Sequence, residues 1–144
     1  MSKATDQGAG APAWKTSRLL PWMRWLSLAT VLIVLVQATL AGQWMFQGKV
    51  NLIFTHGWMG STAWLLVIVI GLMAAYAMWK QHWGGAELWF SVALGLLMTA
   101  QLGMGYMGRE MAVAAAWHIP NGVLIVAVAM ALTTFTWLRG RTLE

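Results

Sequence analysis

Two histidines carry the clearest chemical signal in this sequence. His56 and His118 lie 62 residues apart, each near the start of a long apolar stretch and four residues before a glycine, Gly60 or Gly122. An ionisable ring within a hydrocarbon layer is costly and is usually kept for a ligand, a proton or a partner. Neutral imidazole ligates heme iron well, and two axial histidines leave the iron no open position. The pair predicts a heme b site suited to electron transfer.

Other occupants of the histidine pair stay open at this stage. The two rings could bind a chlorophyll-type pigment or serve only as structural hydrogen-bonding groups. Copper is a further alternative, because thioethers suit Cu(I) and five methionines fall toward the same side, although methionine also fills gaps in apolar cores; these are Met45, Met59, Met104, Met107 and Met111. Zinc is disfavoured, since the pair has no cysteine and no nearby acid to complete three or four ligands.

The elements that must position these histidines are membrane-spanning helices. The chain is 60% apolar and 9% charged over 144 residues, which is typical of an integral membrane protein. Four stretches suffice to cross a hydrocarbon layer about 30 Å thick, at about 20 residues of helix each. They are expected at residues 25–44, 54–79, 88–107 and 117–138. Their apolar runs do not alternate with polar residues, so helices are favoured over a β-barrel. The expected fold class is an all-α, integral membrane four-helix bundle.

The net charge of +5 reflects membrane orientation rather than nucleic-acid binding. Basic residues concentrate before the first span, between the second and third, and after the fourth, which predicts that both termini are cytoplasmic. Residues 1–18 are expected to form a flexible cytoplasmic tail and residues 19–144 the transmembrane domain. The seven residues on the predicted inner side are Lys3, Lys15, Arg18, Arg24, Lys80, Arg139 and Arg141, and the two on the outer side are Lys49 and Arg109.

Tryptophan near the span ends is typical of interfacial belts, in which the indole keeps its N–H wet. Eight of the 11 tryptophans are assigned to such belts: Trp22, Trp25, Trp44, Trp79, Trp83, Trp89, Trp117 and Trp137. His82 lies in the expected cytoplasmic turn between the second and third spans, so it is interpreted as an ordinary exposed residue.

The chain divides into two related helical hairpins. An offset of 62 residues without a gap superposes Leu40 on Leu102, Trp44 on Tyr106, Met45 on Met107, His56 on His118 and Gly60 on Gly122. Each hairpin then carries one histidine at the same height, and spans two and four run in the same direction. Small residues recur below both histidines, which fits either close helix packing or clearance for a cofactor.

Several residues could support the site. Lys49 and Arg109 are expected on the outer side, where they could pair with heme propionates, although loop solvation or contact with lipid headgroups is the favoured role. The second nitrogen of each imidazole needs an acceptor, for which Thr55, Asn121 or a backbone carbonyl could serve. Pro120 is tolerated without cost if the fourth helix begins near Trp117, with residues 112–116 in the outer loop or a short interfacial helix.

Two glutamines and the scarcity of acids complete the chemical inventory. Gln37 and Gln101 lie within spans one and three, where an amide must be paired, and bundle cohesion is the favoured role over lining a quinone or heme pocket. The four acidic residues are dispersed, so no serine–histidine–acid triad can be assembled and no catalytic residue is assigned.

These features resemble one four-helix half of the heme A synthase family. The resemblance covers roughly residues 25–138 and depends on His56, His118 and the paired hairpins. It implies heme b held by histidines of the second and fourth helices near the outer side of the membrane. The family has eight helices and places a glutamate one turn before the helix-two histidine, where this chain has Ile53. The family's oxidation of a heme methyl group is therefore not carried over.

The sequence thus predicts a membrane-embedded b-type cytochrome that transfers electrons, and this role is favoured over that of a stand-alone catalyst. The alternative is an accessory or pigment-binding subunit of a larger respiratory or photosynthetic membrane complex. The expected location is a bacterial-type inner membrane. The expected partners are the lipid bilayer, a membrane protein or a second copy of the chain, and a quinone is a further candidate.

Overall fold

The computed structural model describes residues 17–139, and these residues form four helices and no strand. They are α2 (Leu19–Gln47), α3 (Val50–Gln81), α4 (Gly85–Met107) and α5 (Ala112–Leu138). Each is long and apolar enough to cross a membrane. The predicted all-α four-helix architecture is confirmed, and the chain is a multi-pass membrane protein. The expected tail, residues 1–18, falls outside the described residues except for Ser17 and Arg18.

The helices extend beyond the predicted spans because the connections are very short. Only residues 48–49, 82–84 and 108–111 separate consecutive helices. Gly48 ends α2 at a φ of 67°, and Gly84 precedes α4 at a φ of 93°. Glycine adopts this left-handed conformation at little cost, so it permits an abrupt reversal of the chain. His82 ends α3 at a φ of 55° and is exposed, as predicted for this residue.

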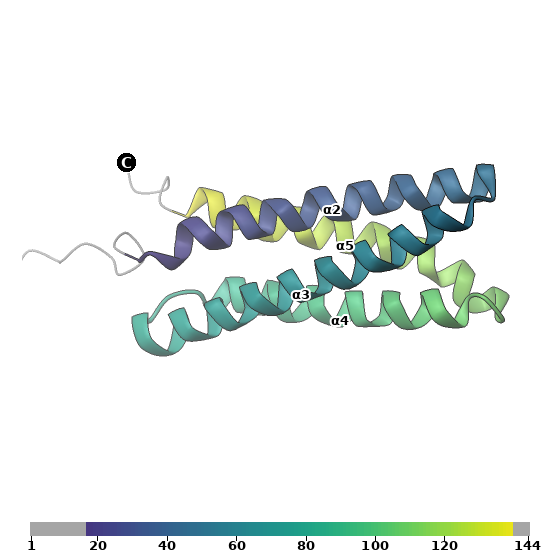
Figure 1. Ribbon diagram of the computed structural model, residues 1–144. Coiled ribbons are helices and arrows are strands. Elements are labelled where there is room, and N and C mark those ends of the chain that lie inside the picture. Colours follow the sequence, from purple (N-terminus) through teal and green to yellow (C-terminus); the bar gives the residue numbers. More distant parts are fainter. Residues whose placement is uncertain (1–16, 140–144) are drawn as a thin grey trace, which may run out of the picture.

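The start of α5 differs from the prediction. The helix begins at Ala112 rather than near Trp117, so Pro120 lies inside the helix and not in its first turn. Proline has no backbone N–H, so the carbonyl of Ala116 loses its helical partner, and the ring crowds the preceding turn. Such a site costs about 3 kcal/mol and commonly kinks a helix. Figure 1 shows α5 bending near this end.

The four helices pack in a ring, so that the two histidine-bearing helices lie across the bundle from each other. Each helix packs on its neighbours in the chain, and α5 closes the ring against α2. In Figure 1, α2 begins and α5 ends at one end of the bundle, beside the α3–α4 turn; we call this the terminal end. The other end carries the α2–α3 and α4–α5 connections, which lie apart from each other, and we call it the histidine end.

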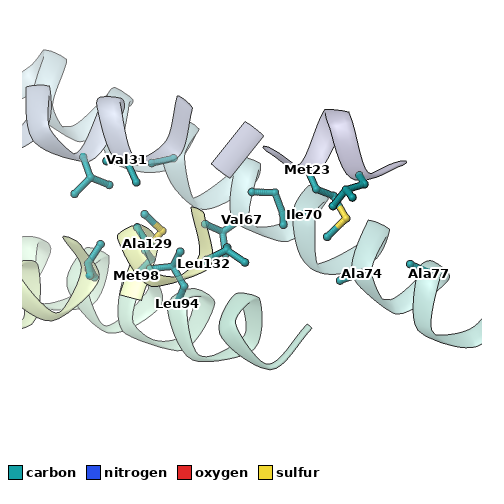
Figure 2. Close-up of a cluster of buried hydrophobic side chains, with 14 of the residues drawn as sticks. Met23, Val31, Val67, Ile70, Ala74, Ala77, Leu94, Met98, Ala129 and Leu132 are labelled. Atoms are coloured by element: carbon teal, nitrogen blue, oxygen red, sulfur yellow. The ribbon is translucent and has the colours of Figure 1, made fainter. Parts of the chain in front are cut away.

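The hydrophobic core fills the middle of the bundle and the terminal end. Figure 2 shows side chains from all four helices meeting there, with Val67, Leu94 and Leu132 among the most deeply buried. The inward face expected below His56 is confirmed in part: Gly60, Ala63, Val67 and Ala74 are buried, whereas Gly71 is half-buried and lines a groove between α3 and α4. Of the residues expected to face inward below His118, Ile125 and Ala129 are buried, and Gly122 and Thr133 are half-buried.

This core stops where the histidines begin. The last buried residue of α2 is Val34, the first of α3 is Gly60, and the last of α4 is Met98. In α5, Ala114 is the single buried residue before Ile125. Apolar packing therefore closes the interior at the terminal end, and few residues are buried around the histidine pair.

A polar network that the sequence did not predict lies at the terminal end. Glu87 in the first turn of α4 is fully buried and forms a bidentate ion pair with Arg139, with an Arg139 Nη2 to Glu87 Oε2 distance of 2.8 Å. Arg24 donates to the carbonyls of Thr136 (3.0 Å) and Arg139 (2.7 Å), and so satisfies the last carbonyls of α5. The network ties α2, α4 and α5 together at their ends.

The eight tryptophans assigned to interfacial belts differ in exposure. Most of the assigned tryptophans are largely exposed on the bundle surface, whereas Trp83 is buried at 6% exposure. Its indole Nε1–H donates to the side chain of Gln81 at 2.7 Å, and the Arg139 guanidinium lies 5.5 Å from its ring centre. Trp83 therefore belongs to the polar network and not to a belt.

Candidate functional site

The structure brings His56 of α3 and His118 of α5 together across the bundle. Their ring centres are 6.2 Å apart, and the ring planes are inclined by 56°. This convergence follows from the direction of the chain, because α3 and α5 both run from the histidine end to the terminal end. The expectation that the two rings lie at the same height is confirmed.

His56 is fixed by a reciprocal contact with Gln37 of α2. The His56 Nδ1–H donates to the Gln37 backbone carbonyl at 2.9 Å, since a carbonyl oxygen can only accept. The Gln37 side-chain amide in turn donates to the backbone carbonyl of His56 at 3.0 Å. The first bond assigns the proton to Nδ1 and leaves Nε2 with a free lone pair, which is the form that ligates a metal.

His118 is held differently. Its Nδ1 is buried and has no hydrogen-bond partner. The backbone of Gln101 on α4 is a candidate acceptor nearby, but it does not reach hydrogen-bonding geometry. The ring instead packs against Gly105 of α4, where a Cβ would come within 3.2 Å of the imidazole Cε1. Sequence reasoning did not identify Gly105 as a site residue. What marks it in the structure is that a residue without a side chain lies against the His118 ring.

The two glutamines make the interhelical bonds expected of them. Gln101 on α4 accepts a hydrogen bond from the Asn121 side chain of α5 at 2.7 Å, and Asn121 also donates to the Leu97 carbonyl at 2.9 Å. The sequence favoured a role for both glutamines in holding helices together. Gln37 links α2 to α3, and Gln101 links α4 to α5. Of the acceptors predicted for the imidazoles, a backbone carbonyl serves His56. Thr55 instead donates to Asn51 within its own helix.

Gly60 and Gly122 both face glutamine side chains. A Cβ on Gly60 would overlap the Gln37 amide, and a Cβ on Gly122 would come within 3.3 Å of the Gln101 amide. Each glycine therefore admits an amide from the neighbouring helix of its own hairpin. Of the two explanations left open for the small residues, close helix packing is the one that these contacts show. A direct role of Gly60 and Gly122 in binding a cofactor stays a prediction.

The charged and sulfur-bearing candidates lie at the same end as the histidines. Lys49 immediately precedes α3, Arg109 lies in the α4–α5 connection, and both are exposed. The Arg109 guanidinium lies 5.4 Å from the ring centre of Tyr106 in the adjacent last turn of α4. Met45, at 71% exposure, and Met107, at 52%, point outward, which does not favour their convergence on a common metal.

The spacing of the two rings fits ligation of one metal ion from opposite sides. Such ligation places imidazole centres about 6 Å apart, because each metal–nitrogen bond is about 2.1 Å and each ring centre lies about 1 Å beyond its nitrogen. Among residues 17–139, no group of three or more His, Cys, Asp or Glu side chains could hold a metal ion. Two imidazole donors alone would suffice only for a metal that brings its own equatorial ligands, as a porphyrin iron does.

Comparison of the chain with protein-family models, curated proteins and solved structures finds no match.

Proposed function

We propose that this protein is a membrane-embedded b-type cytochrome that holds one heme b between His56 and His118 and transfers electrons. The observation that carries the proposal is the pair of imidazoles centred 6.2 Å apart across the bundle, at the point where the apolar core ends. Nδ1 of His56 is occupied by a hydrogen bond, whereas the buried Nδ1 of His118 makes none, so hydrogen bonding does not account for both rings. A shared ligand gives both rings a function.

Different residues of the chain would bind the heme, orient its ligands and exclude water from it. When bound, the heme iron supplies one-electron redox chemistry, and two protein ligands favour electron transfer over oxygen binding. The hydrogen bond from His56 to the Gln37 carbonyl orients one imidazole in advance and increases its basicity. The packed interior below the site, from Gly60 and Ile125 to the terminal end, excludes water from the far side.

The exposed cations of the histidine end would pair with the propionates. Lys49 and Arg109 lie in the connections beside the site, and a carboxylate prefers the polar edge of the membrane to its interior. Electrons would then enter or leave at the histidine end. A membrane protein partner or a quinone is the proposed source or acceptor.

The test is the optical spectrum of the full chain purified from heme-sufficient cells, compared with two ligand variants. The unaltered protein should carry a low-spin heme that is reduced by dithionite. His56→Ala and His118→Ala should each lose the low-spin signature, because each removes one axial ligand. His82→Ala is the matched control, since this third histidine is exposed at the terminal end, and its spectrum should not change. A low-spin spectrum that survives in both ligand variants would exclude the proposed site.

The alternative function is an accessory or pigment-binding subunit of a larger membrane complex. One observation favours it: an outward-facing apolar groove runs between α3 and α4, lined by small residues including Gly71, Ser91 and Gly95. Small residues let a neighbouring transmembrane helix approach closely. A colourless protein that purifies only with larger partners would favour this alternative over the cytochrome.

A further inference from the structure

The two candidate ligands differ in how firmly the chain holds them. His56 donates its Nδ1–H to the Gln37 carbonyl, whereas the Nδ1 of His118 is buried without a partner. A hydrogen bond from the ring nitrogen that does not ligate the metal fixes the orientation of the imidazole and increases its basicity. His56 is therefore the preorganised ligand, and His118 lacks the contact that would make it equally strong.

The helical segment that carries His118 is also weakly attached to the rest of α5. Pro120 removes the backbone bond to the Ala116 carbonyl, so one of the bonds that link the first turns of the helix to the remainder is missing. Few residues are buried near either histidine: only Ala114 between Ala112 and Pro120, and none between Val50 and Met59 of α3. Segments with few buried contacts and missing backbone bonds open at low free-energy cost. No such interruption affects α3, which continues without proline from Val50 to Gln81.

We infer that His118 is the dissociable ligand, and that the position it vacates binds a small neutral π-acceptor such as carbon monoxide. This inference rests on the proposed function, since it requires heme between the two histidines. In the step, the bond between the iron and His118 breaks, and a bond between the iron and the carbon of carbon monoxide forms. The iron remains ferrous, and no proton is transferred. His56 stays bound on the opposite side.

The test measures the rate at which carbon monoxide binds to the dithionite-reduced, heme-loaded full chain. In the unaltered protein, the rate should level off as the carbon monoxide concentration rises, because dissociation of His118 becomes limiting. In His118→Ala, this limit should disappear, and the rate should rise in proportion to the carbon monoxide concentration. In Pro120→Ala, which restores the backbone bond in α5, the limiting rate should fall below that of the unaltered protein.

Three outcomes would overturn the inference. The first is that the reduced protein forms no carbon monoxide complex. The second is that the rate limit disappears in His56→Ala and persists in His118→Ala, which would make His56 the dissociable ligand. The third is that Pro120→Ala leaves the limiting rate unchanged or raises it. All three leave the proposed cytochrome standing, whereas a purified protein without heme would remove both the proposed function and this inference.

Discussion

At the scale of single residues, the site is defined by what lies beside each imidazole rather than by the imidazoles alone. Gln37 fixes His56 from α2, and Gly105 makes room for His118 on α4. Neither partner belongs to the helix that carries the histidine. Each hairpin therefore builds its own half of the site, and the cofactor would join the halves.

Gly105 is predicted to be a positioning residue for His118. In Gly105→Ala, the methyl group would come within 3.2 Å of the imidazole Cε1 and displace the ring, so the fraction of protein that carries low-spin heme should fall. Gly103→Ala is the matched control, because it lies on the same helix with open space around its Cβ position. The measurement is the heme-to-protein absorbance ratio of each purified variant. Equal ratios in the two variants would show that Gly105 does not position His118.

At the scale of the elements, the sequence predicted the four helices and the convergence of the histidines because both depend on simple periodic features. Apolar length determines the spans, and the direction of α3 and α5 places both imidazoles at one end. The start of α5 was predicted wrongly, because Pro120 is tolerated inside the helix at a cost that the sequence does not reveal. The glutamine contacts of Gly60 and Gly122 depend on the packing distance between helices, which small residues permit but do not specify.

The ion pair of Glu87 and Arg139 was missed for a related reason. Arg139 was counted as one of the cations that orient the chain, and Glu87 as one of four dispersed acids. Their partnership is visible only when α4 begins beside the end of α5. An acidic residue in the first turn of a transmembrane helix, two residues after the Gly84–Gly85 pair, is the signal that could have indicated it.

The terminal-end network is predicted to clamp the bundle. Arg139→Leu would leave the fully buried Glu87 carboxylate without its partner, and loss of one member of a buried pair costs about 3–5 kcal/mol. The double variant Glu87→Leu/Arg139→Leu should recover most of this loss, because no uncompensated charge remains. Thermal unfolding in detergent checks both, with Arg109→Leu as a control at an exposed cation. A single variant as stable as the parent would show that the pair does not clamp the helices.

At the scale of the whole molecule, the bundle has two unlike ends. The terminal end is closed by apolar packing and by the arginine–glutamate network, whereas the histidine end has few buried residues and carries the candidate site. Because the candidate site lies at one end of the bundle, its function would take place at one side of the bilayer. The distribution of basic residues predicts that this is the outer side, with both termini in the cytoplasm.

This orientation can be tested directly, because the chain contains no cysteine. Lys49→Cys at the histidine end and Lys80→Cys at the terminal end are both exposed positions in or beside connections. A membrane-impermeant maleimide added to intact cells, or to cells with a permeabilised outer membrane, should label Lys49→Cys. Lys80→Cys should react only after the inner membrane is opened. The opposite labelling pattern would place the candidate site on the cytoplasmic side.

The central claim is that His56 and His118 hold one heme b between them. The most direct measurement is the heme content of the purified full chain, combined with its reduced-minus-oxidised spectrum. The account predicts about one heme b per chain, consistent with one pair of axial histidines, with a low-spin spectrum that is lost in the double variant His56→Ala/His118→Ala. A folded, helical protein that carries no heme, or that keeps the same spectrum in the double variant, would contradict it.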